Sequence, residues 1–359
     1  MKKFTLFLVV ALALTAFLAG YIMVKRGAGS ADLKTGSILD RFNDQRTKVK
    51  EESGDTADAG PISVLLTDKK AISPVLSSDK LSVLYYGKDT GKLYSLKLDS
   101  GEESTVSDNS LPDLVSVFWS PTRKETIHLF NYSGEKVFKE YHLGNITGKK
   151  LDSNIQSVAF APDGNLIAYY YFSEEGVGKV VLSQPDGTYP KTIFNARLKN
   201  VTLTWPSKDM LSLKTDTDLF SLTLDGKKLN KLVDFAIALE EKWSPSGNKL
   251  LYSVFSNDPE DPATLLWLNN LITNEVKQLE IPGSAYNCVW SIDDINVFCA
   301  IPNTASADDI YKINTVDGSY VLAAEPFMIL SELILSPLED QVIFINAVDE
   351  KLYSIKLAD

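Results

Sequence analysis

Residues 160–172 read FAPDGNLIAYYYF, and this stretch carries the pattern that decides the fold. An aromatic residue, Phe160, precedes an Ala-Pro-Asp-Gly turn, and an apolar segment follows from Ile167 to Phe172. Pro and Gly beside Asp are strong turn signals, and a short apolar run rich in aromatic residues after them predicts a β-strand. We therefore expect a β-hairpin that turns at residues 161–164.

The same unit recurs along the chain from residue 61 onward. Each copy places an aromatic or leucine anchor before a turn and an apolar strand, and the anchors are Leu76, Trp119, Phe160, Trp205, Trp243, Trp290 and Leu335. Successive anchors lie between 38 and 47 residues apart. Repeats of about 40–45 residues are typical of propeller blades with four strands each. The sequence therefore predicts an all-β fold, a seven-bladed β-propeller over residues 61–359.

The two ends of the repeat region complete each other. The last repeat stops after a third strand at residues 352–357, whereas an extra apolar run, residues 62–66, precedes the first repeat. We expect this N-terminal strand to close the last blade. Pairing the two chain ends in this way leaves only short sheet edges exposed.

These motifs resemble the WD40-like repeats of TolB-type β-propellers. The closest match is the Phe160–Gly164 turn, and the similarity extends over nearly all of residues 61–359. The resemblance implies an extracytoplasmic scaffold that binds protein or peptide partners.

An apolar run of 21 residues without charge, residues 4–24, precedes the repeats and is flanked by lysine and arginine. About 20 apolar residues span a bilayer as a helix, and the run is longer than the apolar part of a cleaved signal peptide. We expect residues 1–26 to anchor the protein in a membrane as a single pass, with a flexible stalk at residues 27–60 and the propeller on the extracytoplasmic side. A cleaved signal and a buried core helix are the alternatives.

The region after the expected anchor is acidic. The chain has 36 basic and 47 acidic residues, and four of the basic residues precede residue 27. A negative field of this kind repels nucleic acid and other polyanions. We therefore expect no nucleic-acid partner.

Two cysteines, Cys288 and Cys299, flank a predicted turn at residues 291–294. A hairpin centred there places Trp290 opposite Val297 and the two cysteines opposite each other. Directly opposed residues have Cα atoms close enough for a disulfide. We expect a disulfide in an oxidising compartment, with two buried thiols in contact as the alternative.

The loops between the second and third strands of the blades are strongly acidic, and in a propeller they share one face with the linkers between blades. The candidate ligand-binding residues on this acidic face are Asp216, Asp218, Asp258, Glu260, Asp261, Asp308 and Asp309. Carboxylates suit Ca²⁺ or a partner rich in lysine and arginine. The plainer interpretation is a solvated surface on an acidic protein.

No nucleophile elbow, zinc-protease helix or phosphate-binding loop occurs in the sequence. The two histidines, His128 and His142, are too few for a three-histidine metal centre of the kind some propeller lyases use. The Trp anchors are expected to be core residues between blades. We therefore favour a non-enzymatic scaffold that binds a protein or ligand. The alternative is a hydrolase or lyase with a carboxylate-based or cation-dependent site on the acidic face.

Overall fold

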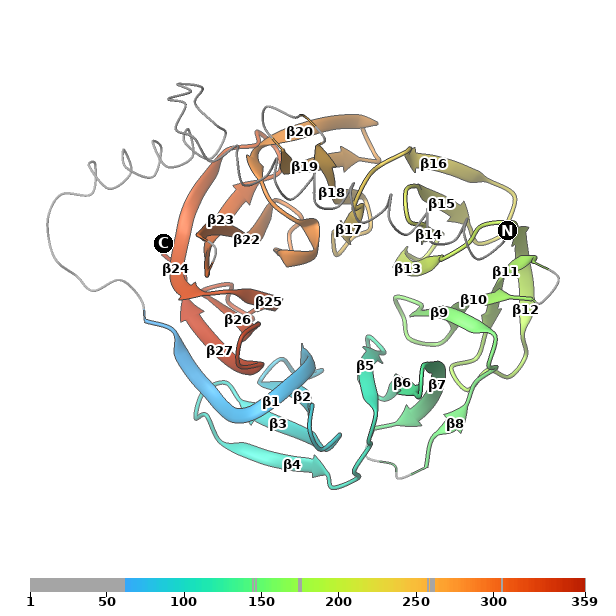
Figure 1. Cartoon of the computed structure of the whole chain (residues 1–359), viewed down its shortest axis with the longest axis horizontal. Coiled ribbons are helices and arrows are strands. Elements are labelled where there is room, and N and C mark those ends of the chain that lie inside the picture. The colour runs from blue at the N-terminus through green and yellow to red at the C-terminus, as the bar shows by residue number, and fades with distance from the viewer. Residues whose placement is uncertain are drawn as a thin grey trace, which may run out of the picture. The chain divides into compact units, whose positions relative to one another are not determined.

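The computed structural model describes residues 62–358, apart from 144, 146, 174, 175, 257, 259–261 and 305. These residues form 27 β-strands and one short 3-10 helix, η1 (Ala285–Asn287). The strands build antiparallel sheets arranged side by side around a ring (Figure 1). The expected membrane anchor at residues 4–24 and the expected stalk lie outside the described residues. Within the described ranges, no helix is long and apolar enough to cross a membrane.

Five sheets have four strands each, in chain order from the first strand to the fourth. They are β5 (Leu114–Trp119), β6 (Glu125–Tyr132), β7 (Glu135–His142) and β8 (Lys149–Lys150); β9 (Ile155–Phe160), β10 (Ile167–Phe172), β11 (Gly178–Ser183) and β12 (Lys191–Ala196); β13 (Thr202–Ser207), β14 (Met210–Lys214), β15 (Leu219–Thr223) and β16 (Leu229–Val233); β17 (Glu240–Trp243), β18 (Lys249–Ser256), β19 (Ala263–Asn270) and β20 (Glu275–Pro282); and β21 (Cys288–Trp290), β22 (Asn296–Thr304), β23 (Ala307–Asn314) and β24 (Tyr320–Met328).

The sixth sheet has seven strands and joins the two ends of the ring. Its strands, from one edge to the other, are β25 (Leu330–Leu335), β26 (Gln341–Asn346), β27 (Lys351–Lys356), β1 (Val64–Leu76), β2 (Ser82–Gly87), β3 (Leu93–Lys97) and β4 (Glu103–Ser107). The start of β1 pairs with β27, where Val64 faces Ser354. The end of β1 pairs with β2, where Leu76 faces Val83.

This sheet confirms one part of the predicted closure and corrects another. The predicted N-terminal strand does pair with the last repeat, through Val64 and Leu65. The prediction of seven separate blades is wrong, because β1 is one continuous strand shared by the first and last repeats. The ring therefore consists of five separate four-stranded blades and one merged seven-stranded sheet.

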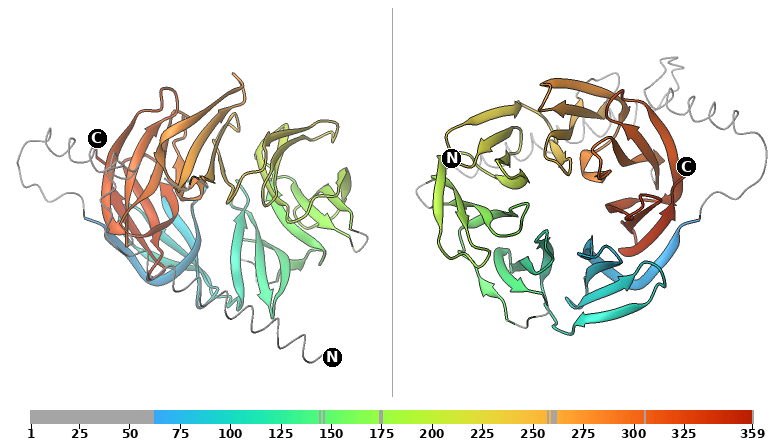
Figure 2. Two further views of the ribbon diagram at one scale, coloured as in Figure 1. Left: turned by 45° about the horizontal axis from the view of Figure 1, so that its top comes forward. Right: turned by 180° about the vertical axis from the view of Figure 1, so that it is seen from behind.

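The core lies between neighbouring sheets rather than in the middle of the ring. Second strands such as β10 are almost wholly buried because sheets cover both of their faces, whereas fourth strands such as β16 are mostly exposed at the rim. Figure 2 shows these outer strands along the periphery of the ring. One core cluster joins Tyr170 of β10 to Trp205 and Leu211 of the next sheet. Continuous apolar runs are thus placed in strands that are buried on both sides.

Two of the tryptophan anchors also link adjacent sheets by hydrogen bonds. The indole Nε1 of Trp119 donates to the backbone oxygen of Ser73 at 2.8 Å, and that of Trp290 donates to the oxygen of Lys242 at 3.1 Å. Each acceptor belongs to the innermost strand of the preceding repeat. The anchors therefore act as inter-blade core residues, as their repeated position predicted.

In six of the seven repeats, the turn after the anchor carries a residue with a left-handed backbone; the turn after Trp205 does not. Gly247 has φ +72°, and a Cβ at this position would lie 2.5 Å from the backbone oxygen of Pro206 in the preceding repeat. At three positions that are not glycine, Arg123, Asp294 and Glu339, the side chain reaches the turn or anchor of the preceding repeat. Glu339 accepts hydrogen bonds from Ser291 Oγ and from the Ile292 amide, at 2.7 and 2.8 Å. The turns thus tie each blade to the one before it.

The disulfide between Cys288 and Cys299 is present, with a Cα–Cα distance of 4.1 Å. The two residues face each other across β21 and β22, and Trp290 faces Val297 in the same register. Both predicted pairs are confirmed. The short turn at residues 291–295 sets this register because the strands on either side continue without a bulge.

Candidate functional site

One face of the ring collects the candidate binding residues. Each four-stranded sheet is an antiparallel meander, so the loops between its second and third strands lie on the same side as the linkers that lead to the next sheet. We call this side the linker face. The turns between first and second strands and between third and fourth strands lie on the opposite face.

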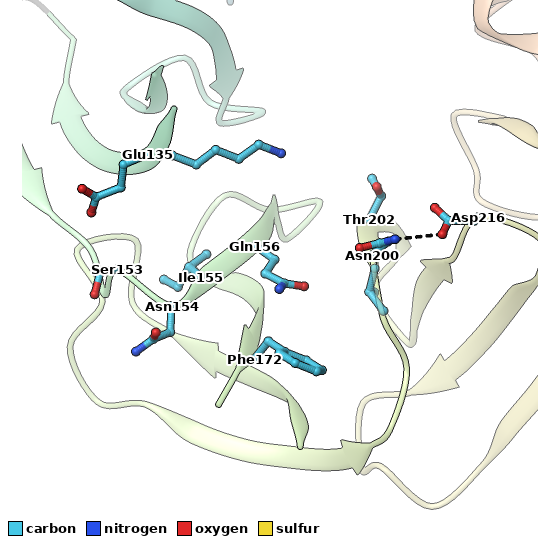
Figure 3. A pocket seen from close by; sticks show the side chains of 11 residues that line it. Glu135, Ser153, Asn154, Ile155, Gln156, Phe172, Asn200, Thr202 and Asp216 are labelled. Carbon is cyan, nitrogen blue, oxygen red and sulfur yellow. Dashed lines mark hydrogen bonds between the residues drawn. The ribbon is translucent and has the colours of Figure 1, made fainter. Parts of the chain in front are cut away.

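A cleft of about 600 Å³ opens on the linker face. It extends from the sheet that contains β7, across β9 and β10, to the sheet that contains β13 and β14. The lining residues are Glu135, Lys136, Ser153, Asn154, Ile155, Gln156, Phe172, Asn200, Val201, Thr202 and Asp216. Figure 3 shows Gln156 and Phe172 between Glu135 on one side and Asn200 with Asp216 on the other.

Neutral hydrogen-bonding groups dominate this cleft. Gln156 and Thr202 are exposed residues at the start of the innermost strands β9 and β13, beside buried Ile155 and Val201. The amide of Asn200 donates to Asp216 at 2.8 Å, and the amide of Asn154 donates to the Tyr171 hydroxyl at 3.3 Å. Amide side chains both donate and accept, so they suit a ligand that also does both.

The predicted acidic residues of the 215–218 loop have different surroundings. Asp216 is exposed and lines the cleft. Asp218 points instead to Lys231, whose ammonium lies 2.9 Å from its carboxylate. Hydrogen bonding from Lys231 lowers the pKa of Asp218 to about 2. Asp216 is therefore a candidate ligand contact, whereas Asp218 is already engaged within the protein.

Asp308 and Asp309 were expected in a long loop, but they are the second and third residues of β23. The strands β22 and β23 pair up to their tight turn, with Pro302 opposite Asp308 and Ile301 opposite Asp309. Both aspartates are buried. The Leu330 amide donates to Asp308 at 2.7 Å and the Asn303 amide donates to Asp309 at 2.6 Å. Burial raises the pKa of Asp308. Asp308 therefore ties β23 to the start of β25, and Asp309 binds within the β22–β23 hairpin.

Asp258 is exposed, while Glu260 and Asp261 lie outside the described residues. Among the residues that the structure describes, no group of three or more His, Cys, Asp or Glu side chains is arranged to hold a metal ion. His128 is buried in the core, and its Nε2 lies 3.0 Å from the Tyr86 hydroxyl. His142 is exposed on the edge of β7. Among the described candidate acids, Asp216 and Asp258 are thus exposed on the linker face, whereas Asp308 and Asp309 are buried.

Sequence reasoning missed most of the cleft. It singled out Asp216, but not Asn154, Gln156, Asn200 or Thr202. The available signal was their position, because each lies in a linker between repeats or at the first residues of an innermost strand. Neutral amides are common on surfaces, so their composition alone did not distinguish them.

Comparison with solved structures finds many propellers of similar fold. An oligogalacturonate lyase in complex with manganese aligns with a TM-score of 0.65 at 14% identity, covering 83% of this chain and 93% of its own. An oligogalacturonate lyase from Vibrio parahaemolyticus aligns with a TM-score of 0.66 at 11% identity, covering 85% and 96%. A putative TolB from Agrobacterium tumefaciens aligns with a TM-score of 0.46 at 15% identity, covering 61% and 83%.

No protein-family model matches the chain, and no curated protein does either. The likeness to solved structures concerns the fold alone at these identities. The β-propeller fold expected from the sequence repeats is thereby confirmed.

Proposed function

We propose that this protein is a non-enzymatic binding module that receives a protein or peptide partner in the cleft on its linker face. The cleft itself carries this proposal. Its floor and walls are mainly amides, hydroxyls and apolar groups, and its charged residues are the exposed Glu135, Lys136 and Asp216. Such a lining can pair with the donors and acceptors of a peptide main chain.

The proposed location of the module is the extracytoplasmic side of a membrane, anchored through residues 4–24. Two features support this location. The apolar run has the length of a membrane span, and the Cys288–Cys299 disulfide is the kind of bond that persists in oxidising compartments.

A lyase is the second candidate function, because two solved neighbours with TM-scores of 0.65 and 0.66 are oligogalacturonate lyases. The residues of this chain do not fit a three-histidine manganese site. The sequence has two histidines, and Nε2 of His128 is enclosed between Thr126 and Tyr86.

The test uses the full chain and a variant that fills the cleft, Gln156→Phe with Thr202→Phe. A matched control, Ile272→Phe, adds the same ring at an exposed position on the opposite face. Partners would be captured from the native membrane and identified by mass spectrometry. We expect the parent and the control to capture the same partner and the cleft variant to lose it.

The same three proteins would be incubated with oligogalacturonate, with and without Mn²⁺, and the ultraviolet absorbance of unsaturated product followed. We expect no product. If product forms with the parent and not with the cleft variant, the protein is a lyase and the proposal of a non-enzymatic binding module is wrong. Partner capture that is equal in all three proteins would place the binding site elsewhere.

A further inference from the structure

Four exposed aromatic side chains gather on one arc of the linker face. Among the described residues, the exposed Phe, Tyr and Trp side chains are Tyr189, Phe235, Phe255, Tyr286 and Phe327. Phe235 and Tyr286 lie in linkers, Phe255 lies near the end of β18, and Phe327 lies near the end of β24. These segments belong to the part of the ring between β16 and β25. We call these four the aromatic arc. Tyr189 lies on the opposite face, in the turn between β11 and β12.

Contacts between the underlying segments make the arc continuous. The Phe255 amide donates to the backbone oxygen of Ile237 at 2.8 Å, so the end of β18 lies against the linker that carries Phe235. The helix η1, which carries Tyr286, packs against β17, β18 and β25. Phe327 precedes β25 by three residues. The segments that carry Phe235, Phe255 and Tyr286 therefore lie next to one another, and Phe327 lies just before β25, against which η1 packs.

Two members of the arc have an unusual backbone. Phe235 is 82% exposed at φ 51°, and Phe327 is 75% exposed at φ 57°. The left-handed region favours glycine and asparagine and is uncommon for a bulky side chain. Both rings are largely exposed, so burial in the core offsets little of this conformational cost. Contact with a partner would offset it, since buried aromatic rings contribute most at interfaces.

Negative charge surrounds the arc. The acidic residues on the linkers and strand ends from β16 to β25 include Asp234, Glu240, Asp258, Glu280, Glu325 and Glu332, and the lysines on or beside them are Lys214, Lys231 and Lys242. Lys231 is bound to Asp218 and Asp234, at 2.9 and 2.5 Å, and Lys214 to Glu240 at 2.6 Å. An excess of carboxylate therefore remains beside the rings.

The rings can also attract cations directly. The ammonium of Lys231 already lies 5.3 Å from the centre of the Phe235 ring, within the range of cation–π attraction. A partner that carries lysine or arginine beside apolar side chains would match both the rings and the carboxylates. We propose that the aromatic arc is a docking surface for a basic, apolar segment of a partner protein, separate from the cleft.

The test removes the rings without disturbing the backbone. In the double variant Phe235→Asn with Phe327→Asn, asparagine tolerates the left-handed conformation, so the variant should fold at least as stably as the parent. Tyr189→Asn is a matched control, because Tyr189 is an exposed aromatic residue at φ 52° on the opposite face. Unchanged thermal unfolding of the double variant would show that a binding defect is not misfolding.

The probe is a library of random twelve-residue peptides displayed on phage and selected against the full chain. We expect the selected peptides to be enriched in Lys or Arg together with Leu, Phe or Trp. As synthetic peptides, they should bind the double variant at least about tenfold more weakly than the parent and the control. The cleft variant should bind them as the parent does, which separates this proposal from the function proposed above.

Three results would overturn the proposal. One is the absence of any enrichment in basic and apolar residues. Another is equal binding of the selected peptides to the parent and the double variant. The third is occupation of the arc by something else. In that case the parent would self-associate in sedimentation, or would bind phosphatidylcholine vesicles, and the double variant would do neither.

Discussion

His128 lies on β6 with its imidazole enclosed by aromatic rings. Its Nε2 is 3.1 Å from the Thr126 hydroxyl and 3.0 Å from the Tyr86 hydroxyl, and its ring stacks on Tyr141 at 4.4 Å. Burial lowers the pKa of this imidazole to about 3, from an ordinary value of 6.5. The side chain therefore acts as a neutral core residue that links the first two repeats, and not as a metal ligand.

This burial predicts a pH dependence of stability. Below about pH 6.5, His128 binds a proton in the unfolded state but stays neutral in the folded state until the pH falls to about 3. The free energy of unfolding therefore falls as the pH falls. The slope from this one group approaches about 1.4 kcal/mol per pH unit between pH 6 and pH 4. In urea titrations, His128→Phe should lose that part of the slope. His142→Phe at the exposed histidine is the control, and an equal slope in all three proteins would contradict the assignment.

The disulfide is a second feature of residue scale. It closes a short loop between residues that are 11 positions apart, and both cysteines are fully buried. Replacing both by alanine should lower the free energy of unfolding by about 3 kcal/mol, from the loss of the covalent constraint on the unfolded chain. Urea titration of the variant would measure the loss, with the reduced parent for comparison. The native protein should show no free thiol by alkylation, and two free thiols would contradict the bond.

At the scale of elements, β1 has two roles. Its first residues pair with β27 and its last residues pair with β2, so one strand fastens the end of the chain to the beginning. Ring closure of this kind depends on backbone pairing more than on side chains, because Val64 and Leu65 are exposed. The first residues of β1 therefore act as a structural clasp, whereas Ala71 and Ile72 farther along the strand are buried in the core.

Deleting residues 62–66 tests the clasp. The deletion removes the pairing of Val64 and Leu65 with β27, and it should lower the free energy of unfolding by on the order of 3 kcal/mol. Thermal unfolding should also become broader as the last repeat loosens. Val64→Thr with Leu65→Thr retains a strand-forming backbone and should be close to the parent. A deletion variant that melts with the parent would show that closure does not stabilise the ring.

At the scale of the whole molecule, the linker face combines a polar cleft, an aromatic arc and excess negative charge. The formal net charge of −11 gives the protein a long-range field that favours basic partners and disfavours polyanions. Charges at the edge of an interface act mainly on the rate of association. The field and the rings should therefore have separable effects.

That separation can be measured with a selected basic peptide. Raising the salt concentration from 50 to 500 mM should slow its association with the parent by roughly tenfold, because salt screens the field, and should change its dissociation much less. The double variant Phe235→Asn with Phe327→Asn should show the same salt dependence of association but faster dissociation. Association that is insensitive to salt would mean that the acidic residues only keep the protein soluble.

Much of the fold followed from the sequence because its signals are local or repeat at a fixed interval. The anchors and turns predicted strands and their repetition, and the extra run at residues 62–66 predicted the strand that joins the last repeat. The disulfide followed from hairpin register alone, since a short turn determines which residues of two strands face each other. Each inference needed only the pattern within one or two neighbouring elements.

Tertiary structure decided the rest, because it depends on how elements far apart in the chain meet. Continuous pairing along β1 merged the first and last repeats into one sheet, and no local signal marks whether a strand is shared. Asp308 and Asp309 were expected on the surface but are buried, because β22 and β23 stay paired up to their turn and both residues lie within the paired strands. The cleft and the aromatic arc arise only when the ring brings separate linkers together on one face. Local sequence signals determine the individual blades, whereas the binding surface forms only when the ring closes.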